Sequence, residues 1–259
     1  MSAAIVEPVT LDVSDTPHIP LSRLTRVELR KLADTRASRW LLIAIAAITA
    51  LIIVIFFLNA SRSDRTFLNF MGATGTPQGF LLPVLGILLV TSEWSQRTAL
   101  VTFTLMPVRG RVLLAKVLAA LIAGIAAIVL AMGIAAVATL AGGADNAWKN
   151  VGIDDIAKFG LLQVSGVLQG LAFGLLFLSS AAAIVVFFVL PTAFSIVASL
   201  WSALKQAAPW VDLGTSQQPL FAGVDLSAEQ WWHLVSGTLI WVVLPFVVGV
   251  WRVLRAEVK

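Results

Sequence analysis

The chain has 259 residues, of which 59% are hydrophobic and only 12% are charged, and its formal net charge is +4. Charged residues normally make up about a quarter of a soluble domain, so this composition excludes an ordinary soluble protein and indicates a chain that folds in lipid. The net charge is read as a signal of membrane topology, and no nucleic-acid partner is expected. The sequence has no cysteine, which excludes disulfides, thiol nucleophiles and thiolate metal sites.

The N-terminal region predicts a polar tail followed by an interfacial helix. Residues 1–20 contain three acids and three prolines, without the basic start and apolar core of a signal peptide, and are expected to form a disordered cytoplasmic tail. Residues 21–39 predict an amphipathic helix that lies in the membrane interface, with leucines on one face and arginines on the other. Glu28 lies toward the apolar edge of this helix and is therefore expected to have a partner.

Six apolar runs predict membrane-spanning helices, so the predicted fold is an all-α polytopic membrane protein in one transmembrane domain, residues 21–259. The second run is the weakest, because only Phe80–Val90 is solidly apolar. Pro77, Pro83 and Gly86 predict that it crosses as a broken helix, and Pro245 predicts a kink in the last span. The expected spans cover residues 40–58, 71–92, 112–141, 159–178, 181–201 and 231–251.

Lysine and arginine are unevenly distributed between the segments that connect the spans. Thirteen of the eighteen belong to one side: six before the first span, four between the second and third spans, and three at the end. Basic connections remain in the cytoplasm, so both termini are predicted to be cytoplasmic and residues 71–92 must cross the membrane. The protein is therefore expected in the cell (plasma) membrane as a multi-pass protein.

The sequence does not indicate an enzyme or an ion-coupled carrier. No acid and no histidine lies in the middle of a predicted span, where a proton relay or cation site would need one. The stretch GATGTPQG lacks the Lys-Ser/Thr ending of a phosphate-binding loop. Ser165 and His233 are not expected to form a catalytic serine–histidine pair, because no Gly-x-Ser-x-Gly motif surrounds Ser165. No catalytic, cofactor-binding or metal-binding residue is predicted, and any driving energy is expected to come from another subunit.

The loop at residues 93–111 is the one connection on the predicted inner side with enough chain to receive such a subunit. Thr98–Met106 can form a short helix on the membrane face, which Pro107 ends. Lys116 is expected to extend its ammonium to the interface from the start of the third span. A short helix joined to two spans can convert a push into a movement of those spans.

Three stretches of this chain resemble the permease subunits of type-2 ABC exporters, particularly actinobacterial ones. They are VELRKLADTRASRW, PVLGILLVTSEWSQRTALVTFTLMPVRGRVLLAK, and the pair PWVDLGTSQQPLFAG and LIWVVLPFVVGVWRVLRAE near the end. The resemblance implies the membrane half of an ATP-driven exporter, which moves a hydrophobic or amphipathic compound (a drug, lipid or peptide) outward. It would pair with a second permease copy or a sister permease and with ABC-type ATPase subunits, which hold ATP and Mg²⁺.

The resemblance assigns ATPase contact to the interfacial helix and to the loop at 93–111. Where the family usually has glycine before Thr98, this chain has Arg97. Each residue also has an ordinary alternative role, as a helix cap, a member of the aromatic belt or a topology signal. The candidate coupling residues are Glu28, Arg30, Lys31, Glu93, Trp94, Arg97, Thr98, Pro107, Arg109 and Arg111.

The later part of the chain suggests packing and path residues. Gly166, Gly170 and Gly174 form a stripe on the fourth span and predict close helix packing, either within the subunit or with a second copy. Gln163, Ser165 and Gln169 are polar at membrane depth and are candidates for a substrate path. Family members fold the outer segment, residues 202–230, into short helices. The alternative function is that of a membrane assembly or interaction protein that transports nothing.

Overall fold

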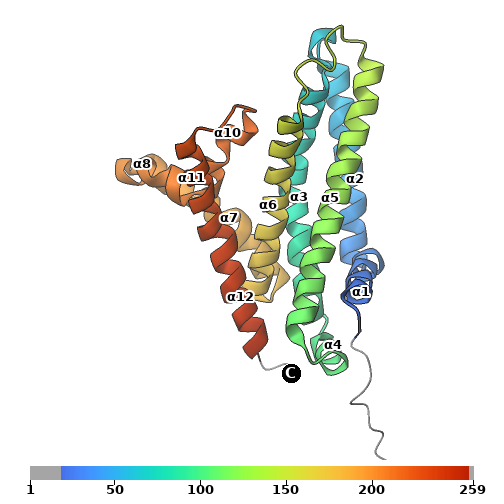
Figure 1. Ribbon diagram of the computed structural model, residues 1–259, viewed down its shortest axis with the longest axis vertical. Coiled ribbons are helices and arrows are strands. Elements are labelled where there is room, and N and C mark those ends of the chain that lie inside the picture. Colours follow the sequence, from blue (N-terminus) through green and yellow to red (C-terminus); the bar gives the residue numbers. More distant parts are fainter. Residues whose placement is uncertain (1–18, 257–259) are drawn as a thin grey trace, which may run out of the picture.

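The computed structural model describes residues 19–256, and this part of the chain is helical with no strand (Figure 1). The predicted all-α fold is confirmed, and six helical segments are long and apolar enough to cross a membrane. The predicted tail lies almost wholly outside the described residues. The helices are α1 (Leu21–Asp34), α2 (Arg36–Asn59), the 3₁₀ turn η1 (Arg62–Asp64), α3 (Phe67–Ser95), α4 (Ala99–Leu105), α5 (Arg109–Gly142), α6 (Ile153–Phe177), α7 (Ser180–Leu200), α8 (Ser202–Val211), α9 (Leu213–Ser216), α10 (Gln218–Phe221), α11 (Ala228–Thr238), the π-helical turn η2 (Leu239–Val243) and α12 (Leu244–Arg255).

Helix α1 runs across the spanning helices. Figure 1 views α1 along its axis, while α2, α3 and α5 run along the long axis of the molecule. The predicted helix at residues 21–39 ends earlier, because Thr35 is extended (φ −73°, ψ 134°) and separates α1 from α2. The helix that contains the first predicted span begins at Arg36, four residues before Trp40. The arginines of α1 are exposed, whereas Leu32 is buried, as an interfacial helix requires.

Helix α3 is continuous, so the prediction of a broken second span is wrong. Pro77 and Pro83 both lie inside the helix. Each proline removes one backbone hydrogen bond, but α3 is the central helix and packs against α2, α5 and α6. Surrounding helices support proline-containing spans in this way because they restrain the backbone where the hydrogen bond is missing.

The glycine stripe of α6 packs within the chain, against α3. A Cβ atom built on Gly170 would lie 2.0 Å from the carbonyl oxygen of Pro83, and one on Gly174 would lie 3.1 Å from that of Ile87. Gly86 of α3 makes the reciprocal approach, since its Cβ would lie 2.5 Å from the carbonyl oxygen of Val167. The absence of side chains on both helices lets the two backbones touch.

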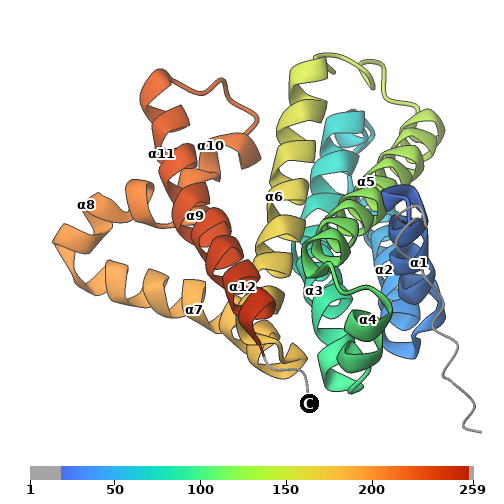
Figure 2. The ribbon, with the colours of Figure 1, turned by 60° about the horizontal axis from the view of Figure 1, so that its bottom comes forward.

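The chain after α6 forms a second group of helices, which we call the arm (α7–α12). Figure 2 shows α7, α8, α11 and α12 on one side of α6, and α1–α5 on the other. The predicted tight turn between the fourth and fifth spans is confirmed, because α7 begins at Ser180, directly after Leu178 (φ 54°) and Ser179. The outer segment contains the short helices α8, α9 and α10.

The last span contains a wider turn where a proline kink is predicted. Residues Leu239–Val243 form a π-helical turn directly before Pro245. The ring of a proline clashes with the carbonyl four residues earlier, and a wider turn accommodates it. The predicted capping box at the start of this span is confirmed, since Ser227 and Gln230 bond to one another's backbone N–H groups at 2.8 and 3.2 Å.

Candidate functional site

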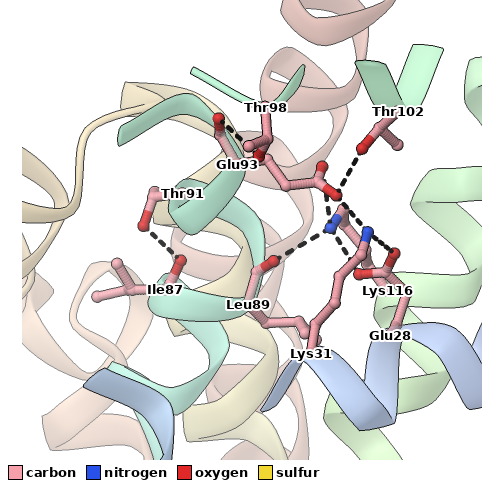
Figure 3. Close-up of polar contacts among 9 residues, drawn as sticks. All are labelled: Glu28, Lys31, Ile87, Leu89, Thr91, Glu93, Thr98, Thr102 and Lys116. Carbon is pink, nitrogen blue, oxygen red and sulfur yellow. Dashed lines mark hydrogen bonds and ion pairs between the residues drawn. The ribbon is translucent and has the colours of Figure 1, made fainter. Parts of the chain in front are cut away.

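Helices α1–α6 form a bundle, and four charged side chains from three of them meet near one end of it (Figure 3). We call these residues the charge cluster: Glu28 and Lys31 of α1, Glu93 of α3 and Lys116 of α5. Lys116 Nζ lies 2.7 Å from Glu28 Oε2 and 3.2 Å from Glu93 Oε2. Lys31 Nζ lies 2.7 Å from Glu28 Oε1 and 2.5 Å from Glu93 Oε1. Each lysine therefore bridges both glutamates, and the four charges form a closed ring.

The charge cluster is neutral and largely removed from solvent. The exposed fractions of Glu28, Glu93 and Lys116 are 3–4%. A buried ion is stabilised only when its partners replace the water that it has lost, and two acids against two bases meet that condition. The prediction that Lys116 extends to the interface is wrong, because its ammonium is held inside by Glu28 and Glu93. The predicted partner of Glu28 is confirmed.

The charge cluster also binds the short helix α4. Thr102 of α4 donates its Oγ1 hydroxyl to Glu93 Oε1 at 3.0 Å, and Lys116 donates to the carbonyl of Leu89 at 3.2 Å (Figure 3). The interfacial helix, the end of α3, helix α4 and the start of α5 are thus joined through one set of polar contacts.

Lys31 is the partly exposed member of the charge cluster. Burial lowers the pKa of its ammonium, but the attraction and hydrogen bonds of Glu28 and Glu93 outweigh burial and raise that pKa above its ordinary value. A raised lysine pKa means that the ion pairs contribute fully at neutral pH, and are lost only as the pH rises through the raised value. Lys31 is therefore expected to keep its charge, and its ion pairs with Glu28 and Glu93, at neutral pH.

The turn from α3 into α4 contains Arg97, at the position where the resemblance expects glycine. Arg97 has φ +56°, in the left-handed region that favours glycine. The N–H of Thr98 donates to the carbonyl of Glu93 at 2.8 Å, and the N–H of Arg97 donates to that of Trp94 at 3.3 Å. These two bonds form a Schellman motif, whose left-handed position is most often glycine. The backbone geometry therefore fits the glycine that the resemblance expects there.

Two arginines of the loop at 93–111 contact the backbone elsewhere in the chain. Arg109 donates to the carbonyls of Val253 (2.9 Å), Leu254 (3.3 Å) and Ala256 (2.8 Å) at the end of α12. Arg111 donates to the carbonyl of Ile19 at 2.6 Å, just before α1. A cation at a helix C-terminus pairs with carbonyls that have no partner within the helix. Arg109 therefore ties the start of α5 to the end of the arm.

The other coupling candidates divide into inward-facing and outward-facing residues. Glu28 and Glu93 are buried in the charge cluster, so a role for them would be to position α4 and not to touch a partner. Trp94 is half-buried against Phe103 of α4. Four of the candidates are exposed, as are four apolar side chains of α4 and its flanks: Arg30, Arg97, Thr98, Pro107, and Leu100, Val101, Leu105 and Val108.

The three predicted path residues do not form one lining. Gln163 lines a cavity of about 640 Å³ between α2, α3, α6 and α10, and donates to Gly75 O at 3.2 Å and to Gln78 Oε1 at 3.3 Å. Ser165 accepts a hydrogen bond from Gln217, which precedes α10, at 2.8 Å. Gln169 is buried further along α6. Neither Ser165 nor Gln169 lines this cavity. Gln163 and Ser165 thus connect α6 with α3 and with the outer segment.

Within residues 19–256 there is no group of three or more acidic or histidine side chains placed to hold a metal ion. Neither the family models nor the curated proteins compared with this sequence give a match. The site is therefore interpreted from its own geometry and from the motifs given above.

Proposed function

We propose that this chain is the permease subunit of an ABC-type exporter, in which α4 receives the movement of a separate ATPase subunit. The ATPase would supply ATP hydrolysis and Mg²⁺, and two permease chains would enclose the path of a hydrophobic or amphipathic compound. The end of the molecule that carries α4 would face the cytoplasm, in agreement with the excess of basic residues there.

The observation that carries this proposal is the bond from Thr102 to Glu93. It joins α4 to the charge cluster, and so to α1, α3 and α5. Helix α4 also carries open apolar side chains, since Val101 and Leu105 are 56% and 75% exposed. A helix that is anchored inward by polar bonds and apolar outward is suited to docking in a protein groove.

The first experiment tests docking. The tagged chain is purified together with the ABC-type ATPase encoded nearest to it, and Val101→Asp is compared with Val224→Asp, a control of similar exposure (49%) in the loop before α11. We expect Val101→Asp to reduce the copurified ATPase at least about tenfold, because a buried unpaired charge costs more than 1.4 kcal/mol. Equal recovery with both variants would place the docking surface elsewhere. A wild-type chain that retains no ATPase would favour a membrane assembly protein.

The second experiment separates docking from coupling. Thr102→Val removes the hydroxyl that binds Glu93, whereas Thr104→Val removes a hydroxyl that bonds only to Val101 of the same helix. We expect Thr102→Val to keep the ATPase bound but to lower transport per ATP hydrolysed about three- to tenfold, since a hydrogen bond to a charged group contributes about 1 kcal/mol or more. The Thr104→Val variant should behave as wild type. Equal coupling in both would remove the charge cluster from the mechanism.

A further inference from the structure

The junction of α1 and α2 contains an open hollow of about 780 Å³, which we call the elbow pocket. It lies around Thr35, where the chain turns from the interfacial helix into the first span, and Gln96 at the end of α3 closes one side. The charged residues in its lining are Arg30, Lys31, Asp34 and Arg36. The pocket is thus walled by three cations and one acid.

Two of these cations have no internal counter-charge. Lys31 is already bound by Glu28 and Glu93. Arg30 and Arg36 are exposed, and among residues 19–256 neither makes an ion pair within 4 Å. With Lys31 neutralised, Arg30 and Arg36 outweigh Asp34, and the pocket keeps a net positive charge.

The start of α2 adds donors to the same place. This helix has 24 residues, and no side chain caps its N-terminus. Thr35 is among the lining residues, and its hydroxyl Oγ1 is buried without a hydrogen-bond partner in the described part of the chain, so it does not cap the helix. Free N–H groups and the positive end of a helix dipole favour an anion. The first turn of α2 thus presents uncapped N–H groups beside the guanidinium groups of Arg30 and Arg36.

The exposed side chains beyond the pocket identify the class of ligand. Trp40 and Ile43 follow Arg36 at four- and seven-residue spacing and so share its face of α2; they are 66% and 50% exposed. This apolar face continues along a span whose central window is only 17% buried. A molecule with its anion at Arg36 would therefore meet a basic pocket at one end and a lipid-facing helix surface at the other.

We propose that the elbow pocket binds the phosphate headgroup of an anionic phospholipid, with its acyl chains along Trp40 and Ile43. This inference concerns the single chain and does not depend on an ATPase partner. It assigns Arg30 and Arg36 to a defined lipid site, in addition to the general attraction of basic residues to an anionic membrane surface.

The test uses the full chain in detergent, with phosphatidylglycerol and phosphatidylcholine as probes and native mass spectrometry to count bound lipids. We expect one phosphatidylglycerol per chain to bind more tightly than phosphatidylcholine. Arg30→Gln/Arg36→Gln should weaken that binding about 25-fold, since each arginine near an anionic headgroup contributes roughly a factor of five. The control, Arg23→Gln/Arg26→Gln, removes two exposed arginines of α1 outside the pocket and should change binding less than about threefold. Asp34→Asn should tighten it up to about fivefold.

Four results would overturn the proposal. The first is equal affinity for both lipids, and the second is an equal loss of lipid affinity in both double variants. The third is displacement of the lipid by excess inorganic phosphate. The fourth is a variant Arg30→Gln/Arg36→Gln that keeps the lipid but loses a copurifying protein. The third result would indicate a site for a free anion, and the fourth a site for an acidic protein segment. The variant Arg30→Lys/Arg36→Lys, which keeps the charge, and the unfolding temperature of each protein control for folding.

Discussion

The bundle (α1–α6) and the arm (α7–α12) are built in different ways. In an 18-residue apolar stretch of α3 and of α6, 56% and 61% of the residues are buried, whereas the share is 11% in α7, 22% in the last span and 17% in the peripheral bundle helix α2. Within the bundle, glycines bring backbones together and paired charges join three helices at one end. The arm meets the bundle mainly along α6, where α12 packs closely: Gly249 lies against Leu175, and Arg252 donates to the carbonyl of Leu176. The bundle is therefore organised around the buried pair α3 and α6, whereas the arm joins it along α6 and leaves most of α7 open.

The largest expected effect is the loss of one charge in the cluster. Lys116→Met leaves Glu28 and Glu93 buried with Lys31 alone, and should lower the free energy of unfolding by about 3–5 kcal/mol. Lys205→Met, which removes an exposed lysine of the arm, should change it by less than about 0.5 kcal/mol. Denaturant titration of the protein in detergent measures both.

A double variant sharpens this first prediction. Glu28→Met/Lys116→Met leaves Lys31 and Glu93 as a neutral pair and should recover most of the lost free energy of unfolding, since apolar replacements of buried ion pairs are often tolerated. A double variant no more stable than Lys116→Met would show that packing, and not charge balance, explains the loss.

The next largest effect is expected where the backbones of α6 and α3 touch inside the bundle. In Gly170→Ala the new methyl would lie 2.0 Å from a backbone oxygen and 2.7 Å from the Cα of Pro83. Neither atom can move without shifting α3, so we expect destabilisation of about 1–3 kcal/mol. Gly160→Ala lies on the same helix with no atom within 4 Å and should be neutral or stabilising. Similar unfolding temperatures for the two variants would contradict the close packing of α3 and α6.

A smaller effect is expected where the arm meets the bundle. Arg109→Gln removes the guanidinium that binds the last carbonyls of α12, and should lower the local stability of that end by about 1–2 kcal/mol. Hydrogen exchange of the last turn of α12 should accelerate accordingly. Arg111→Gln removes the same charge two residues later without touching α12 and serves as the control. Unchanged exchange in Arg109→Gln would mean that the arm is held by other contacts.

The smallest expected effect is an increase in the free energy of unfolding. Arg97→Gly relieves a left-handed residue in the Schellman turn and should raise the free energy of unfolding by about 0.5–1 kcal/mol. Gln96→Gly, one residue earlier at φ −93°, should lower it by a similar amount. A destabilised Arg97→Gly variant would show that the arginine side chain stabilises the turn by contacts that outweigh its backbone strain.

Sequence reasoning predicted the features that depend on composition and local pattern. Apolar runs and charge parity located all six spanning helices, including the weakly apolar second one. The capping box at Ser227 and the end of α4 before Pro107 follow from local rules. The position of Glu28 near the apolar edge of α1 was enough to predict a partner for it, although not which one.

The features that sequence reasoning missed depend on contacts between distant segments. Lys116 lies 88 residues from Glu28, and its burial is decided by the two glutamates that surround it. Pro77 and Pro83 signal a break, but the helices packed around α3 keep it continuous. Arg109 was predicted as a coupling residue or a topology signal, and its contact with α12 was missed because the partner carbonyl lies 144 residues away. The signal that could have indicated the cluster is an acid on α1, an acid at the end of α3 and a lysine two turns into α5.

The separation of the cluster's charges along the chain has a consequence during synthesis. Glu28, Lys31 and Glu93 leave the ribosome before Lys116, so α3 reaches the insertion machinery with an acid that lacks one of its two bases. A lone charge in a span is costly to release into the bilayer. The first three spans should therefore enter the lipid together, once α5 has arrived, and a nascent chain stopped before residue 116 should stay crosslinkable to the translocon.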